Sequence, residues 1–461
     1  MFDKLKYIPS YNKNEFLSYS FIFILYLSFI TAVGLGFQYF IVGLFYPSNS
    51  EFVLFSPDSM VANQHAIDLA LRLEVDFFKY ITPFPSKGFS LNTALVGICY
   101  FLFGIDPYIN IFINSFFHAS SAFLLFLIFL KLRNITKASI ASSFLCSIIF
   151  LIWPSSILWL SEISKDYICF FTFILYIYGI LVFHSSHLVT ERLKGIIYIT
   201  LSITLLYFIR DHYIQFYLLI ILAYIIYFII INRFEIFNFT KKNINKTFLL
   251  FILCLLLFMF QSSLSNKDNQ KIAPKELYNN FEIVAFDALD LTYKSAKGKE
   301  WKSYSIIPEY IDQKLRYISS INIVGKDIAE ATNAETILNE NLFFLSSSDF
   351  IKYAPLIFYQ SFFEPYPLKF NMKEAKHLLS SFEMIIIYFC YAMIFFLKRK
   401  DFTNIMFFIF FALIIHIFVF TIISSTYGTL YRIRSPYILL FALLILKPFA
   451  EKLINKFKHA R

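Results

Sequence analysis

The sequence has few charged residues for its length. Of 461 residues, only 16% are Asp, Glu, Lys or Arg, whereas soluble domains carry about a quarter. Glycine is also scarce, with 11 residues, and none of them forms a phosphate-binding loop, a dinucleotide-binding pattern or the G-x-S-x-G turn of a hydrolase. These shortages exclude an ordinary water-soluble enzyme and give no sign of a nucleotide site.

Neither the cysteines nor the histidines indicate a metal site. The five cysteines lie inside apolar stretches, with no CxxC or paired spacing, which is typical of small buried hydrophobic residues. A disulfide framework and a cysteine-based zinc site are therefore excluded. The eight histidines form no metal-binding constellation. We expect no resident metal or cofactor, although a need for a divalent metal ion stays open.

The sequence is instead dominated by long apolar runs. Apolar residues make up 58% of the chain and aromatic residues 21%, and mean hydropathy is +0.63. A membrane-spanning helix needs about 20 apolar residues. The chain is therefore expected to be an all-α polytopic membrane protein with about ten transmembrane helices. The runs cover residues 16–46, 107–130, 139–160, 167–183, 195–209, 213–232, 247–262, 380–397, 402–424 and 437–450.

Basic residues alternate along the connections between these runs. Every second connection is basic, and these segments together with both termini hold 20 bases against six acids, while the rest holds 21 bases and 25 acids. Because cytoplasmic loops are enriched in Lys and Arg, this pattern predicts that both termini are cytoplasmic. The net charge of +10 is then a topology signal, and no nucleic-acid partner is expected.

The pattern divides the chain into three parts. Residues 1–262 form an N-terminal transmembrane module that includes a first outer loop at 47–106, residues 263–379 form an outer segment, and residues 380–461 carry the C-terminal transmembrane helices. The chain has no internal repeat, so an inverted-repeat transporter is not supported.

The first outer loop is expected to contain two helices on the membrane surface. Residues 58–80 have helical periodicity, and Lys87 to Gly104 is apolar but too short to span. In the first helix a charged stripe lies opposite an apolar face. The stripe contains His65, Asp68, Arg72, Asp76 and Lys79, and the apolar face contains Met60, Ile67, Ala70, Leu71 and Phe78. The alternative is that these charged side chains only form ion pairs with one another, four residues apart, on a face of the helix that water covers.

Asp58 follows Pro57 at the start of this helix. It is either an acid of the first helical turn, where a negative charge is favourable, or a catalytic carboxylate that faces a cavity.

Charged residues also occur at outer ends of runs, where bases are unexpected. Glu162, Lys165 and Asp166 open the fourth run and are expected on one helix face, with either a functional role or a simple Lys165–Glu162 pair. Arg210 and Asp211 join the fifth run, which is only about 15 residues long, to the sixth. Arg210 is therefore expected at the edge of the hydrocarbon or in a cavity, where an ionisable group indicates a functional role. The alternative is that Asp211 simply neutralises it.

Arg432 and Arg434 precede Pro436 before the last run. Because a residue before proline prefers an extended conformation, and side chains at i and i+2 share one side of an extended segment, the two guanidinium groups are expected to bind one phosphate together. The alternative is that both anchor to lipid headgroups.

Short motifs follow one another along the ten runs. They are Pro57-Asp58-Ser59, Leu102-Phe103-Gly104, Trp153-Pro154 with Ser164-Lys165-Asp166, Phe208-Ile209-Arg210, Phe363-Glu364-Pro365-Tyr366-Pro367 and Gly428-Thr429-Leu430-Tyr431-Arg432-Ile433-Arg434-Ser435-Pro436. Each motif is weak alone, but in this order they resemble the GT-C superfamily of integral-membrane glycosyltransferases, which includes protein O-mannosyltransferases and the bacterial lipid A aminoarabinose transferase. The chain departs from the family in having the single Asp58 where a DxD or DE pair is expected.

The resemblance implies transfer of a sugar from a polyprenyl-phosphate donor to a glycan, lipid or protein acceptor at the outer face of the bacterial inner membrane. Asp58 would be the general base. Arg432, Arg434, Arg210 and Lys165 would hold the donor phosphate, with Glu162, Asp166, Asp211 and His65 in support.

Three other functions remain open at this point. A polymerase of O-antigen or capsule repeat units also has many spans, one large outer loop and outer-face arginines. A lipid-linked sugar flippase or other transporter would need a charged path across the membrane, and the runs are almost free of ionisable groups. A purely structural membrane subunit is the third alternative.

Overall fold

The computed structural model is helical almost throughout the part of the chain that it describes, and the chain is a multi-pass membrane protein. Six helices within that part are long and apolar enough to span a membrane: Ser18–Phe40, Ile109–Lys131, Asp166–Ser185, Val189–Ile209, Leu379–Phe396 and Asn404–Ile423. The structure describes residues 13–42, 57–81, 91–132, 135–186, 188–210, 213–231, 301–304, 307–331, 342–364, 375–424 and 427–459.

These six helices coincide with predicted runs, but the run at 139–160 is not one helix. Helix α7 (Lys137–Leu151) ends after 15 residues, and the short helix α8 (Pro154–Leu158) follows it. Trp153, which precedes Pro154, has the extended backbone that proline imposes on its neighbour (φ −64°, ψ 125°). The apolar sequence runs on through this break, so hydropathy alone missed it.

The run at 195–209 is longer than predicted. Helix α10 (Val189–Ile209) has 21 residues, because its first turns include the charged residues Glu191, Arg192 and Lys194. Arg210 therefore follows the last residue of a full-length helix, and the prediction of a short fifth span was wrong.

The remaining runs compare less directly. Helix α11 (Ile214–Ile231) corresponds to the run at 213–232, and the last run lies inside the 33-residue helix α19 (Tyr427–His459). The run at 247–262 lies outside the described residues.

The chain forms two compact units. Unit 1 comprises residues 1–259, 390–410 and 442–461, and unit 2 comprises residues 260–389 and 411–441. The division into three parts along the sequence stays a prediction.

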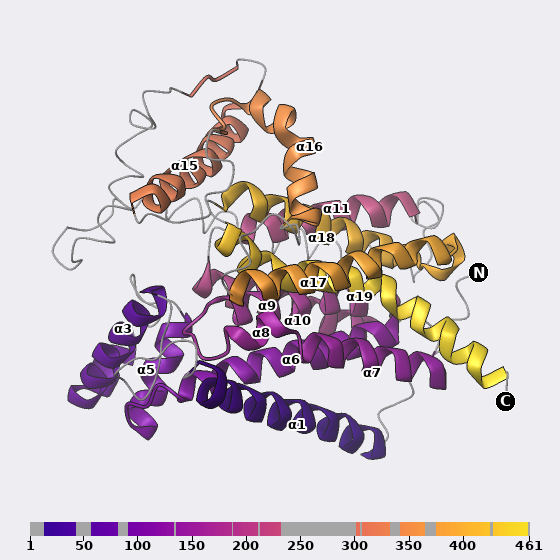
Figure 1. Ribbon diagram of the computed structural model, residues 1–461, viewed down its shortest axis with the longest axis horizontal. Coiled ribbons are helices and arrows are strands. Elements are labelled where there is room, and N and C mark those ends of the chain that lie inside the picture. The colour runs from indigo at the N-terminus through magenta and orange to yellow at the C-terminus, as the bar shows by residue number, and fades with distance from the viewer. Residues whose placement is uncertain are drawn as a thin grey trace. The chain divides into compact units, whose positions relative to one another are not determined.

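In unit 1, long apolar helices pack side by side (Figure 1). Helix α6 (Ile109–Lys131) contacts α1 (Lys13–Gly36), α7 and α9 (Asp166–Ser185), and α9 contacts α10. Membrane helices approach most closely where small residues meet, and α9 and α10 do so at Gly179 and Gly195.

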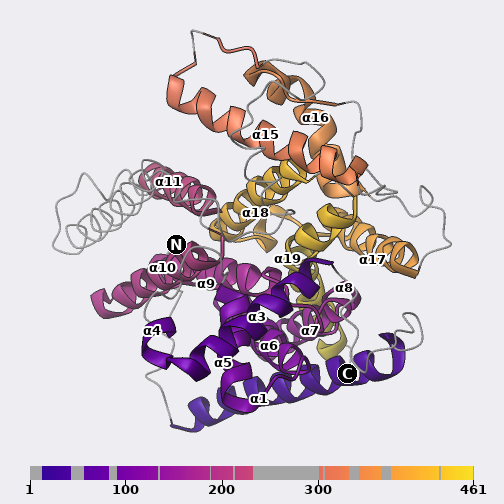
Figure 2. The same ribbon diagram turned by 90° about the vertical axis from the view of Figure 1, so that its left-hand side faces the viewer.

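Two helices of the predicted first outer loop pack together in unit 1, as Figure 2 shows from the front. Helix α3 (Pro57–Val75) packs on α5 (Leu91–Phe103), and the short helix α4 (Phe77–Ile81) follows α3. A helix is confirmed at each predicted place, but the first ends at Val75, so Asp76 lies between α3 and α4 and Lys79 belongs to α4. Their position on the membrane surface stays a prediction. Gly104, with a φ of +93°, ends the second as expected.

The predicted apolar face of α3 was partly wrong. Its buried stripe is Ala66, Leu69, Ala70 and Leu73. Met60, Leu71 and the following Phe78 are exposed. The reason is close packing, because a Cβ atom at Gly97 of α5 would lie 3.0 Å from the Ala66 carbonyl oxygen. Gly97 thus lets α5 approach both the Ala66 carbonyl and the Leu69 side chain.

Unit 2 contains α15 (Glu309–Ala331), α16 (Ser347–Phe363), most of α17 (Ala375–Ala392), the second half of α18 (Asn404–Ile423) and the first half of α19. A small apolar core formed by Phe344, Ile357 and Ile422 joins the segment before α16, α16 itself and the end of α18. Figure 1 shows α16 running from beside α15 toward α17 and α18.

Candidate functional site

The segment between α8 and α9 is held by buried side-chain hydrogen bonds from two other helices of unit 1. Asn114 of α6 donates through Nδ2 to the carbonyls of Leu160 (2.8 Å) and Glu162 (2.6 Å), and Asn92 of α5 donates to the Ser164 carbonyl (2.8 Å). Both asparagines are 1% exposed. Because these side chains replace water as partners of buried carbonyls, they fix the path of residues 160–164.

Glu162 belongs to this segment and not to the helix that follows. Helix α9 begins only at Asp166, so the prediction that Glu162, Lys165 and Asp166 share one helix face was wrong for Glu162. Its side chain is buried, whereas Lys165 is exposed. Glu162 thus places a buried carboxyl group beside the start of α6, and Lys165 places a cation at the surface.

Arg210 and Asp166, 44 residues apart, form an ion pair at this end of unit 1. Arg210 Nη2 lies 3.0 Å from Asp166 Oδ1, with side-chain exposures of 16% and 15%. Arg210 Nη1 donates to the hydroxyl of Tyr213 (2.6 Å), and the guanidinium also lies over the Tyr213 ring. Ser164 Oγ donates to the other carboxylate oxygen of Asp166 (2.9 Å). The guanidinium is thus oriented on two sides.

The surroundings keep this guanidinium charged. Burial alone would lower the pKa of Arg210, but Tyr213, Cys169 and Asp166 raise it, and the net shift is upward. At neutral pH Arg210 therefore carries a positive charge.

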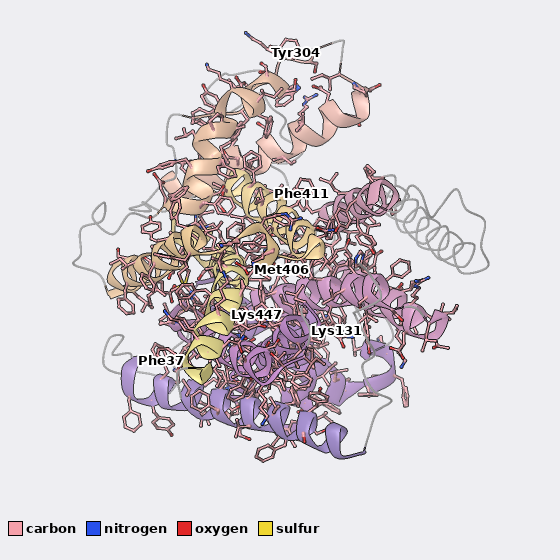
Figure 3. All side chains as sticks on the ribbon, turned by 90° about the vertical axis from the view of Figure 1, so that its right-hand side faces the viewer. Phe37, Lys131, Tyr304, Met406, Phe411 and Lys447 are labelled. Atoms are coloured by element: carbon pink, nitrogen blue, oxygen red, sulfur yellow. The ribbon has the colours of Figure 1, made fainter. Side chains whose placement is uncertain are left out.

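The opposite end of unit 1 gathers the bases of the predicted cytoplasmic connections. Helices α6 and α9 both begin at the Asp166 end, so α6 ends at the other end, at Lys131, and α7 begins there at Lys137. Lys447 of α19 donates to Ser139 Oγ of α7 (3.2 Å), and Figure 3 faces this end, with Lys131 and Lys447 labelled. Lys131, Lys137 and Lys447 therefore lie at the end of unit 1 away from Asp166, and which end faces the cytoplasm stays a prediction.

Arg434 lies in unit 2, in a helix and not in an extended segment. Helix α19 already includes residues 431–436, so Arg432 and Arg434 project about 200° apart and cannot fork onto one phosphate from one side. The preference of a residue before proline is overridden within this long helix. The joint site predicted for the two arginines therefore lacks its geometric basis.

The Arg434 side chain is 1% exposed and bonds to the end of α16. Its Nη1 donates to the carbonyls of Gln360 and Ser361 (2.8 Å for Ser361), and its Nη2 donates to the Glu364 carbonyl. Arg432 is half-buried. One turn earlier than Arg434, Tyr431 donates to Glu383 of α17, a fully buried carboxylate.

The other predicted site residues are placed less fully. Asp58 lies in the first turn of α3, and its side chain is outside the described part of the structure. His65 is half-buried on the same helix. Asp211 lies outside the described residues. The gathering of Asp58, Arg210 and Arg432 in one pocket stays a prediction, since Arg432 belongs to the other unit.

Sequence reasoning missed Tyr213, Asn92 and Asn114. An asparagine in an apolar helix is itself a signal, because such amides hydrogen-bond across helices in membranes. Tyr213 carried no signal in a chain with 31 tyrosines.

Comparison with protein-family models and with curated protein sequences finds no match for this chain.

Proposed function

We propose that this protein is a membrane glycosyltransferase that moves a sugar from a polyprenyl-phosphate donor to an acceptor at the outer face of the bacterial inner membrane. The observation that best supports this proposal is the Arg210 guanidinium, which Asp166 and Tyr213 hold at the end of unit 1 opposite its basic end. A guanidinium has five N–H donors, so those left over by these two contacts can bind phosphate oxygens.

The topology that goes with this function has ten spans, GT-C-like, with both termini in the cytoplasm. The basic end of unit 1 then faces the cytoplasm, and the Arg210–Asp166 cluster faces outward. The bilayer delivers the donor by lateral diffusion, so no nucleotide site is needed.

In the reaction, an acceptor hydroxyl attacks the anomeric carbon, and the bond from that carbon to the phosphate oxygen breaks. Asp58 takes the hydroxyl proton. Charge grows on the departing polyprenyl phosphate, where Arg210 and the exposed Lys165 stabilise it. Arg434 already donates to carbonyls of α16, so it is not part of the proposed phosphate site. Glu162, Asp166, Asp211 and His65 support the site.

The proposal is tested with purified protein in vesicles, a panel of polyprenyl-phosphate-linked hexoses and pentoses, and a cell-envelope extract as acceptor. Mass spectrometry follows the release of polyprenyl phosphate. We expect release with at least one donor, and at least a tenfold loss in Arg210→Ala but not in Lys194→Ala, an exposed base at the opposite end.

No release with any donor would contradict the proposal. Products that grow by whole repeat units would indicate a polymerase, and sugar that crosses the membrane with its phosphate bond intact would indicate a flippase.

A further inference from the structure

The C-terminal end of α16 is held by three helices of unit 2 that belong to predicted spans. Ser361 Oγ donates to Thr421 Oγ1 of α18 (2.7 Å), Tyr388 of α17 donates to the Phe363 carbonyl, and Arg434 of α19 donates to carbonyls of the same turn. Ser361 and Arg434 are 0% and 1% exposed. The last turn of α16 is therefore part of the helix bundle.

These contacts place the end of α16 at membrane depth. The apolar span in α17 runs from Leu379 to Phe396, so Tyr388 lies about 13 Å along it at 1.5 Å per residue. The hydrocarbon core is about 30 Å thick. A backbone carbonyl that meets the hydroxyl of Tyr388 consequently lies below the headgroups.

A helix that ends at this depth needs donors for its last carbonyls. The final four C=O groups of any helix have no partner within the helix, and hydrocarbon offers no water to replace them. Arg434 and Tyr388 supply these donors. The negative end of the helix dipole in turn stabilises the buried guanidinium. This explains why a cation is buried beside backbone carbonyls.

The outward face of α16 is apolar and aromatic. Leu356, Tyr359 and Phe363, spaced at i, i+3 and i+7, are all exposed and lie on one side of the helix. The Phe363 ring packs at 6.2 Å from the ring of Tyr388. On α17, the neighbouring Phe389 is exposed as well. The apolar surface of α16 therefore continues that of a membrane-spanning helix.

The first half of α16 is more polar. It begins with Ser347, Ser348 and Asp349, and Lys352 is exposed on it. A lysine in this position can extend its ammonium to the headgroup region.

We propose that α16 enters the bilayer by its C-terminal end, so that Leu356, Tyr359 and Phe363 contact the hydrocarbon chains of the lipids while Ser348 stays in water. Arg434 is the positioning residue that holds the buried end. This inference depends only on unit 2 and on the membrane location, and it stands whether or not the protein transfers sugar.

Spin labels measure the depth directly. Nitroxides are attached to Ser348→Cys, Tyr359→Cys and Phe363→Cys in the full-length protein in phosphatidylcholine vesicles, with the unsubstituted protein as background. We expect the ratio of oxygen to nickel-chelate accessibility to rise severalfold from position 348 to position 363. Equal ratios along the helix, or ready access of the nickel chelate to position 363, would overturn the proposal.

A second comparison tests the role of Arg434. We expect Arg434→Gln to shift the label at position 363 toward the aqueous phase, whereas Arg432→Gln, on the other side of the same helix, leaves its depth unchanged. An unchanged depth in a folded Arg434→Gln protein would remove Arg434 as the positioning residue. If Arg434→Gln does not fold, the accessibility ratios measured along α16 in the protein that keeps Arg434 decide the proposal alone.

Discussion

Gly179 of α9 and Gly195 of α10 lie so close together that a side chain on either would meet the backbone of the other helix. A Cβ atom at Gly195 would lie 2.8 Å from the Gly179 carbonyl oxygen, and one at Gly179 would lie 2.9 Å from that of Gly195. Backbone atoms cannot move aside as the end of a flexible side chain can. This contact holds α10 against α9 and thereby sets where Arg210 meets Asp166.

Gly195→Ala should therefore destabilise the protein, even though alanine favours helices. Overpacking costs about 1–3 kcal/mol, and here the backbones would have to separate. Thermal unfolding in detergent measures the loss. Gly36→Ala is the control, because a Cβ atom there meets nothing within 4 Å. Equal unfolding temperatures for the two variants would mean that α9 and α10 are not this close.

Asp166→Asn should reduce both stability and sugar transfer, because it leaves Arg210 with the Tyr213 hydroxyl but without its carboxylate. Breaking a buried ion pair costs about 3–5 kcal/mol, and the partial exposure of this pair reduces the expected loss to about 1–3 kcal/mol. Denaturant unfolding measures it.

The matched control is Glu191→Gln, which breaks the exposed Glu191–Lys194 pair (2.7 Å) at the other end of α10. A change of less than about 0.5 kcal/mol is expected there. Similar losses in the two variants would argue against a special role of the Asp166–Arg210 pair.

Local patterns in the sequence predicted α3, α5 and the glycine that ends α5, because amphipathic period and turn chemistry act over a few residues. They did not predict the partner of Arg210. Asp211 was the neighbour in sequence, whereas the observed partner, Asp166, belongs to the preceding helix. The pairing of Arg210 with Asp166 depends on how α9 and α10 pack. Local patterns in a single sequence do not predict that packing.

The same limit explains the error at Arg432 and Arg434. The preference of a residue before proline for an extended backbone is a local effect of limited size. Inside an apolar environment the backbone gains more by completing helical hydrogen bonds, and α19 runs through Pro436. The preference of a residue before proline for an extended backbone therefore did not predict the helical conformation at the start of α19.

Asn114→Leu should release the segment before α9. The substitution is similar in volume, but it removes the side-chain donor of the Leu160 carbonyl and leaves the Glu162 carbonyl with the Ser164 N–H as its donor. A buried unpaired carbonyl costs about 1–3 kcal/mol. Hydrogen exchange of residues 159–165 should become faster. Ser120→Ala serves as the control, since that hydroxyl bonds only its own helix at Phe116 (2.7 Å). Unaltered exchange in Asn114→Leu would show that the segment is ordered by other contacts.

Lys447 is a buried cation, 1% exposed in its side chain, which lies 3.0 Å from Glu451 and 3.2 Å from Ser139 Oγ. Glu451→Gln should destabilise the protein by about 3–5 kcal/mol, because it leaves that charge uncompensated. The double variant Lys447→Met with Glu451→Gln should recover most of the loss, since no unpaired charge remains. Additive losses in the double variant, measured by denaturant unfolding, would show that the two residues act independently.

Asp58→Asn tests the chemistry of the proposed transfer. Asparagine keeps the size of the side chain and its place in the first turn of α3 but cannot accept a proton from the acceptor. Release of polyprenyl phosphate should fall at least 100-fold, within the range attributed to general acid–base catalysis, about 10²–10⁴. Donor binding and the unfolding temperature should stay unchanged. Asp68→Asn is the matched control on the same helix, where the carboxylate accepts a bond from Gln64 (3.2 Å) near the surface. If Asp58→Asn remains fully active, the base must be sought among other carboxylates, and the buried Glu162 beside the start of α9 is the first to test.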